Sequence, residues 1–181
     1  MENIDFWTEK IHKNAVDHGW WASPRPFGEV CALIHSELSE ALEAYRDGKP
    51  EFYREPEGDP HGKPEGTAVE LADAVIRILD YAGAARLDID PYAEDSFGED
   101  FDSDCFGDFI ARCHADVTDA YLCDRDDERA DVTDALSRCV ARIERWFRFW
   151  TVQSGIDLEA VIAAKHEYNR GRPYRHGGKI L

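Results

Sequence analysis

Apolar residues recur at spacings of three and four along most of this chain, and this period limits the fold more than any other feature of the sequence. Such spacing places side chains on one face of an α-helix, whereas a half-buried strand needs strict alternation. Sustained alternation is hard to find here, so we predict an all-α protein. The predicted helices cover residues 4–18, 26–47, 66–86, 104–123, 127–153 and 157–170.

Two stretches that lack the helical period are predicted to be loops. Residues 49–66 hold four prolines among glycines, and residues 88–104 are rich in acids. Proline and glycine interrupt helices, which supports both assignments. A chain of 181 residues suits one domain of ordinary size and is too short for two well-separated domains. We therefore expect a single domain over residues 1–181.

The chain is strongly acidic, with a formal net charge of −17. This charge repels the backbone of nucleic acids and anionic membranes, so neither is expected as a partner. No apolar run approaches the roughly 20 residues that span a bilayer. The first residues are acidic where a signal peptide would be basic, so a cytoplasmic location is expected.

The cysteines are odd in number and form neither a CxxC pair nor a cluster with histidine. This spacing disfavours disulfides and a structural zinc site. Buried free thiols in a reducing compartment are the expectation. The five residues are Cys31, Cys105, Cys113, Cys123 and Cys139.

Carboxylates fall within or beside the apolar stripes of two consecutive predicted helices. Glu37 lies inside the stripe of helix 26–47, and Glu40 lies one turn further along its edge. In helix 66–86, Glu70, Asp73 and Asp80 gather along one border of the apolar face. A buried carboxylate without a cation is unfavourable, so a positive partner is expected.

If these two helices pack antiparallel, four carboxylates can converge across one seam. Clusters made only of oxygen ligands suit Mg²⁺ or Mn²⁺ better than zinc. The alternative is that the acidic pairs lie on solvated helix faces.

The C-terminal segment reverses the charge of the chain. Lys165 and Asn169 are four residues apart and project from one face of helix 157–170. The other cations of this segment are Arg170, Arg172, Arg175 and Lys179, beside His176. Arginine forks bind phosphate oxygens closely, and a metal facing cations is an arrangement that holds a polyphosphate. The alternative is a solvated basic terminus that balances acids elsewhere.

Three motifs occur in a fixed order along the chain. They are Glu37-Leu-Ser-Glu40-Ala-Leu-Glu43, Gly66-Thr-Ala-Val-Glu70-Leu-Ala-Asp73-Ala-Val-Ile-Arg77-Ile-Leu-Asp80 and Lys165-His-Glu-Tyr-Asn169-Arg-Gly-Arg172-Pro173-Tyr-Arg-His176-Gly-Gly-Lys179. Together with Gly19-Trp20-Trp21 and Pro26-Phe27-Gly28-Glu29, they resemble the MazG-like, all-α nucleoside triphosphate pyrophosphohydrolases. The resemblance covers residues 15–85 and 155–181 and leaves 100–153 as extra helices.

The resemblance implies a metal-binding helical bundle in which a small-molecule nucleotide is the partner. A nucleoside triphosphate and water would give the monophosphate and pyrophosphate, by attack on the α-phosphorus. Mg²⁺ would be the cofactor, with Mn²⁺ as a substitute. The catalytic metal ligands would be Glu37, Glu40, Glu70 and Asp73, with Glu43 and Asp80 as candidate extra ligands. The residues expected to bind the substrate are Trp20, Lys165, Asn169, Arg172, His176 and Lys179.

One position departs from the family pattern. The first motif usually reads EExxE, and Ser36 stands in place of its first acid. That acid is a candidate for orienting the water or holding an extra ion. A protein that binds nucleotide and metal with little turnover is therefore the alternative function, and a structural helical oligomer with solvated acids is a third.

Trp20 and Trp21 have two interpretations, namely stacking on a base and packing in the core. An internal similarity also stands out, because residues 35–41 recur in softened form as 114–120. We predict that 104–153 is a degenerate copy that packs on helices 26–47 and 66–86 and completes a four-helix bundle. The extra helices would then replace a partner, whereas a homodimer is the alternative.

The predicted copy keeps the spacing of the acids but carries aspartates, whose side chains are shorter than those of glutamates. The residues concerned are Asp116, Asp119, Asp131 and Asp134. Aspartate reaches less far than glutamate, so a working second metal site is not expected.

Overall fold

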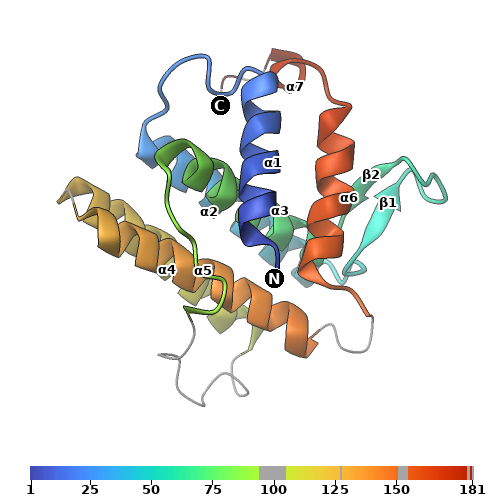
Figure 1. The fold of residues 1–181 in the computed structure, drawn as a ribbon. Helices are drawn as coiled ribbons and strands as arrows, with labels where there is room; N and C mark the ends of the chain where they lie inside the picture. The colour runs from blue at the N-terminus through green and yellow to red at the C-terminus, as the bar shows by residue number, and fades with distance from the viewer. Residues whose placement is uncertain (94–104, 127, 151–154, 179, 181) are drawn as a thin grey trace.

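The helices predicted from the apolar period are present in the computed structural model, which describes residues 1–93, 105–126, 128–150, 155–178 and 180 (Figure 1). They are α1 (Ile4–Asp17), α2 (Phe27–Arg46), α3 (Thr67–Ala85), α4 (Phe106–Arg125), α5 (Arg129–Trp150) and α6 (Leu158–Arg170). A short α7 (Arg175–Gly178) follows in the tail, where no helix is predicted. The all-α prediction is confirmed, and the long helices start and end within a few residues of their predicted limits.

The predicted loop 49–66 needs a correction, because it contains two short strands. β1 (Tyr53–Glu55) pairs antiparallel with β2 (Lys63–Glu65). Strands of three residues are too short to show alternation in a sequence. Gly66 joins β2 to α3 with a φ of 116°, and a Cβ there would lie 2.5 Å from the Pro50 carbonyl oxygen. Only glycine fits this turn.

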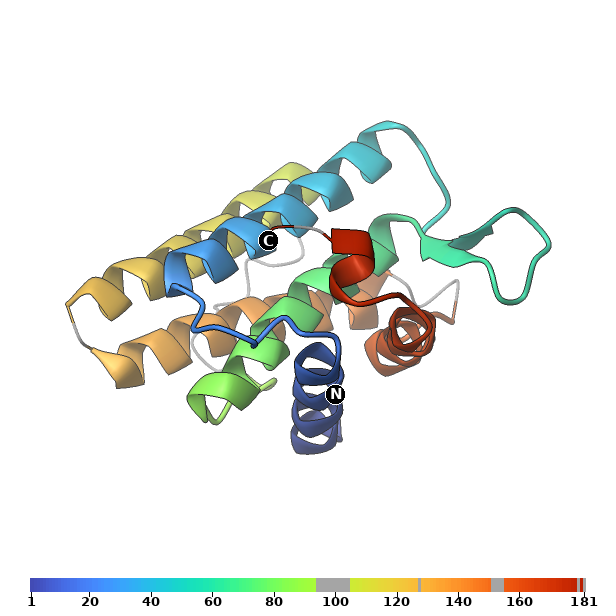
Figure 2. The same ribbon diagram turned by 90° about the horizontal axis from the view of Figure 1, so that it is seen from above.

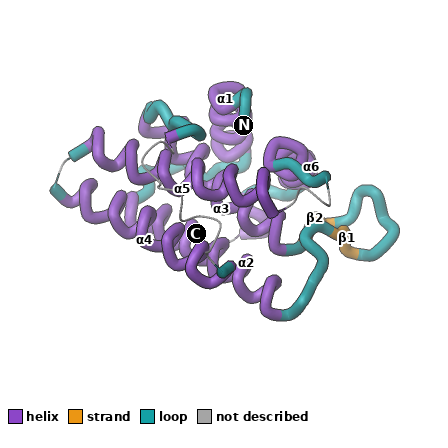
Figure 3. The backbone as a smooth tube through the Cα atoms, turned by 90° about the horizontal axis from the view of Figure 1, so that it is seen from below, coloured by secondary structure: helices purple, strands orange, loops and turns teal. Residues whose placement is uncertain are grey.

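α2, α3, α4 and α5 form a four-helix arrangement. α2 packs along α3, and α4 packs along α5; the two pairs meet where α2 contacts α4 and α3 contacts α5. Figures 2 and 3 show these four helices as neighbours, with α2 lying beside α4. The extra helices therefore pack on α2 and α3, which is where the sequence analysis expects them.

α3 is the central helix, because α1, α2, α5 and α6 all pack against it. Most of its apolar side chains are buried, and Leu71, Val75, Ile78 and Leu79 are completely so. A single cluster of buried apolar residues draws on every helix from α1 to α6. The acids of α3 are thus held on a helix with little freedom to move.

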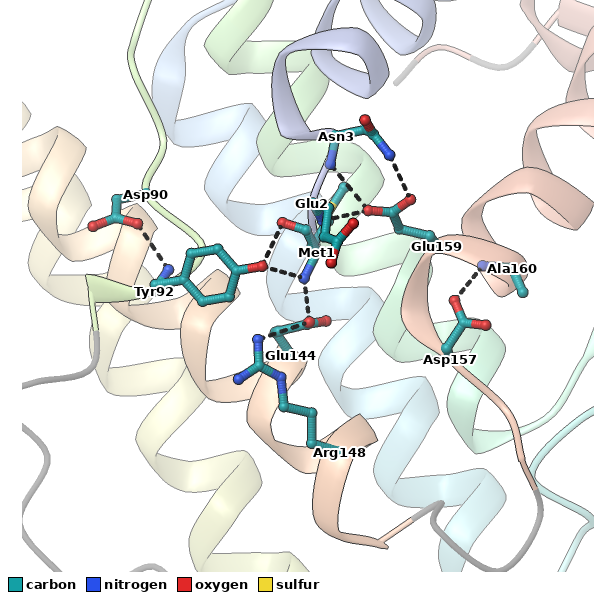
Figure 4. A network of polar contacts seen from close by, with 10 residues as sticks. All are labelled: Met1, Glu2, Asn3, Asp90, Tyr92, Glu144, Arg148, Asp157, Glu159 and Ala160. Atoms are coloured by element: carbon teal, nitrogen blue, oxygen red, sulfur yellow. Dashed lines mark hydrogen bonds and ion pairs between the residues drawn. The ribbon is translucent and has the colours of Figure 1, made fainter.

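The first residues of the chain tie α1 to α5 and α6 (Figure 4). The Met1 ammonium contacts the Glu144 carboxylate of α5, and the Tyr92 hydroxyl lies 3.2 Å from the same ammonium. Glu159 of α6 accepts a hydrogen bond from the backbone N–H of Asn3 at 3.1 Å. These contacts fix the start of α1 next to α6.

The five cysteines are free thiols, as expected. Cys31, Cys113 and Cys139 are buried. Burial was expected of Cys105 too, but this residue is exposed because it precedes α4 at the helix end. Within the described ranges, none of the helices combines the length and apolar character needed to cross a bilayer.

Candidate metal and phosphate site

The hairpin of α2 and α3 brings three acids together. Glu37 of α2 and Glu70 and Asp73 of α3 each place a carboxylate oxygen within 4.8 Å of the other two. Glu37 is 8% exposed and Glu70 is 7% exposed. We call Glu37, Glu70 and Asp73 the acid cluster.

The acid cluster lines a cavity of about 260 Å³. The walls come from α1, α2, α3, β2, α6 and the segment after α6. Most of the predicted substrate-binding residues line it as well, namely Trp20, Lys165, Asn169, Arg172 and His176. Lys179 lies outside the described residues.

The remaining predicted ligands differ in their positions. Glu40 lines the cavity but is exposed, and its Oε1 accepts a hydrogen bond from the Ser36 hydroxyl at 2.9 Å. Asp80 also lines the cavity, but its Oδ1 is bonded to His12 Nδ1 at 2.9 Å and to Trp21 Nε1 at 2.7 Å. Glu43 is exposed and is not part of the cavity wall. Glu40 thus lies at the rim of the cavity, and Asp80 is occupied by hydrogen bonds to His12 and Trp21 and is not part of the acid cluster.

Two cationic side chains form ion pairs with members of the acid cluster. The Lys165 ammonium lies 2.5 Å from Asp73 Oδ2, and Lys165 is only 4% exposed. The Arg77 guanidinium donates to Glu37 Oε1 through Nε at 3.1 Å and through a terminal nitrogen at 3.0 Å. The sequence analysis gave Arg77 no role, although its position one turn after Asp73 on the same face was visible.

Despite these cations, the pKa values of two of the acids are raised. Burial raises the pKa of Glu70 to about 8, and the nearby Asp73 carboxylate adds to this rise while Lys165 opposes it. Burial and Asp73 also raise the pKa of Glu37, against the effect of Arg77. Three ionised carboxylates at this distance need more positive charge, which a divalent cation would supply.

One buried polar atom of the cavity has no partner. Asn169 Oδ1 is buried and makes no hydrogen bond within the part of the chain that the structure describes. A buried acceptor without a donor is unfavourable. The side-chain amide therefore suits a ligand group, either as an acceptor or, after rotation, as a donor.

Part of the cavity lining is apolar. Ile11 and Ala15 of α1, Leu33 of α2 and Ile76 of α3 belong to it, as does the polar Asn14 of α1. Trp20 is 8% exposed and its ring meets the His176 ring edge-on at 5.2 Å. Sequence reasoning missed the wall formed by α1, because that helix carries no motif.

The second helix pair keeps acids at the repeated positions but pairs them with arginines. Asp116 of α4 is buried and receives a hydrogen bond from Arg142 Nε at 3.0 Å, and Asp119 pairs with Arg138 at 2.7 Å. Asp131 and Asp134 are exposed, and Asp131 lies with Cys123 and Glu128 in a second group whose ligand atoms are within 4.8 Å of one another. Asp116 and Asp119 are thus neutralised by arginines of α5.

The two helix pairs meet at equivalent positions. His35 of α2 and His114 of α4, which match in the internal repeat, bring their Nδ1 atoms to 2.7 Å. The ion pair Arg77–Glu37 between α3 and α2 has a counterpart in Arg142–Asp116 between α5 and α4.

Comparison of the chain with protein-family models, with curated proteins and with solved structures finds no match. The resemblance to the MazG-like family therefore stays a prediction from the motifs. The function is inferred from the residues that line the cavity.

Proposed function

We propose that this protein is a Mg²⁺-dependent nucleotide pyrophosphohydrolase, which converts a nucleoside triphosphate and water into a nucleoside monophosphate and pyrophosphate. One observation carries the proposal: the acid cluster shares a single cavity with Lys165, which pairs with Asp73, and with Arg172. Buried acids that need a cation, beside cationic side chains in the same cavity, match the charges of a metal-bound polyphosphate.

The acid cluster would hold the ion, and Glu40 lies at the rim of the same cavity. When bound, Mg²⁺ supplies positive charge against the phosphoryl oxygens and lowers the pKa of water; Mn²⁺ would substitute. Lys165 and Arg172 would bind phosphate oxygens, and Asn169 offers its unpartnered amide.

In the reaction, the oxygen of water bonds to the α-phosphorus, and the bond from that phosphorus to the bridging oxygen breaks. Pyrophosphate leaves with the electron pair of the broken bond. Glu40 is assigned as the carboxylate that accepts the proton of the attacking water, because it lines the cavity outside the acid cluster. The nucleoside would lie against the apolar part of the lining, beside Trp20 and Ile76.

A second part of the proposal concerns the domain. We assign residues 1–181 to one MazG-like domain, in which α4 and α5 are a degenerate copy of α2 and α3. The repeated histidines and the matching ion pairs support this relation.

The test is pyrophosphate release from a panel of standard and modified nucleoside triphosphates, with Mg²⁺ and with a chelator. Glu37→Ala and Glu70→Ala should each abolish turnover while the protein stays folded by circular dichroism. Glu43→Ala, which removes an exposed carboxylate from α2, is the matched control and should keep full activity. Unchanged turnover in both cluster variants would contradict the proposal.

A second function is favoured by Ser36. Its hydroxyl occupies the position of the first acid of the motif and bonds to Glu40. A protein that binds nucleotide and metal with little turnover would show thermal stabilisation by nucleotide without product. No response of either kind would favour a structural helical protein.

A further inference from the structure

The Lys165 ammonium occupies the place that a cation would take at the acid cluster. It comes from α6, lies 2.5 Å from Asp73 Oδ2 and is almost completely buried. Asp73 belongs to the group whose oxygens lie within 4.8 Å of one another. An ammonium at hydrogen-bond distance from Asp73 and a divalent cation bound to the same oxygens exclude each other by size and by charge.

In the second helix pair, an arginine side chain lies beside the acids at the repeated positions. Arg138 contacts the two acids of α4 at the repeated positions, with Nε 3.5 Å from Asp116 and a terminal nitrogen 2.7 Å from Asp119. There the cation comes from the helix that packs along α4. At the acid cluster it comes from α6, on a long flexible side chain that also lines the cavity.

We propose that Lys165 is an exchangeable counter-ion: in the metal-free protein it holds the place of the divalent cation at Asp73, and metal binding displaces its ammonium into the cavity. This inference rests on the proposed metal site but not on turnover. Lys165 and the metal compete for Asp73, so the ion binds weakly on its own. The displaced ammonium then becomes available for a phosphate group, which couples the binding of metal to the binding of phosphate.

The test is the affinity for Mn²⁺ without nucleotide, measured by electron paramagnetic resonance of the free ion. Lys165→Met removes the competing charge and should tighten Mn²⁺ binding by about tenfold, within the usual range for coupled binding events. Lys165→Arg keeps the charge and should stay near the wild-type affinity. The titration is made at pH 8.5, so that protons compete little for Glu70.

The matched control is Arg170→Met, which removes one positive charge from the same helix. Arg170 is exposed and pairs with Glu167 at 2.7 Å, so its loss tests the general effect of net charge. An unchanged or weaker Mn²⁺ affinity in Lys165→Met, or an equal gain in Arg170→Met, would overturn the proposal.

A second measurement needs no variant. Amine labelling of the wild-type protein, followed by peptide mass spectrometry, should show that Mg²⁺ raises the labelling rate of Lys165 severalfold. The exposed Lys13 serves as the internal reference and should not change. A Mg²⁺-independent rate at Lys165 would contradict the exchange.

The outcomes separate this inference from the proposed function. Tighter Mn²⁺ binding in Lys165→Met, in a protein that releases no pyrophosphate from any nucleotide, would support the exchange and contradict the enzyme. If none of the proteins binds Mn²⁺, both the exchange and the metal site are wrong.

Discussion

Glu70 is a carboxylic acid whose surroundings favour its protonated form near neutral pH. It is buried on the central helix, with Asp73 beside it, and its pKa is raised to about 8. In the unfolded chain the same group titrates near 4.5. The folded protein therefore binds more protons than the unfolded protein between these two pH values. Its stability without metal should fall as the pH rises through this window.

Glu70→Gln should remove this loss. At pH 8, in the presence of a chelator, we expect the variant to exceed the wild type by about 4 kcal/mol in free energy of unfolding, since the pKa rises from 4.5 to about 8 and one pKa unit corresponds to about 1.4 kcal/mol. The gain should shrink towards pH 5. Chemical denaturation at a series of pH values measures it, with Glu43→Gln as the control. A gain that is the same at every pH would show that the effect is not ionisation of Glu70.

Ser36 tests whether the missing acid of the first motif limits the reaction. Its side chain lines the cavity and reaches Glu40, so Ser36→Glu should add a carboxylate at the rim. We expect turnover to rise by about tenfold or more, as is typical for a well-placed acid–base group. Ser39→Glu, on an exposed position of the same helix, is the control. A fall in turnover in Ser36→Glu but not in Ser39→Glu would show that the reaction is faster with serine at position 36 than with an acid there.

At the scale of the elements, the α4–α5 pair depends on one buried ion pair. Arg142 is 5% exposed and bonds to the buried Asp116. Arg142→Met removes the closer of the two cations that contact this carboxylate, leaves it with Arg138 at 3.5 Å, and should cost about 3 kcal/mol of stability. The double variant Asp116→Leu with Arg142→Met should recover most of the loss. Urea denaturation measures both; a small effect of the single variant would show that Asp116 finds another cation or water.

The elements were largely predictable, because each long helix buries one apolar stripe and so carries its own period. The β1–β2 hairpin was not, because three-residue strands leave no pattern. The acids and Lys165 were named correctly as neighbours in one cavity because their spacing places them on facing helices. The role of Arg77 and the wall formed by α1 were not predicted, because a single cation or apolar residue becomes informative only when packing shows what it faces.

At the scale of the whole molecule, the second helix pair packs against α2 and α3 within the same chain and so covers one face of that hairpin. We therefore expect one copy of the chain in solution. Sedimentation equilibrium should give the mass of a single 181-residue chain at micromolar concentration, with and without Mg²⁺. A dimer at the lowest measurable concentration would show that another face associates.

The arginines of α5 give the two helix pairs a different dependence on the surroundings. Asp116 and Asp119 take their counter-charge from groups that are part of the same polypeptide, so a shortage of divalent ions does not remove it. Under the proposed function, the acid cluster of the first pair depends on Mg²⁺ from solution. A shortage of the ion would then stop the reaction while the helices stay packed, and turnover would return with the ion.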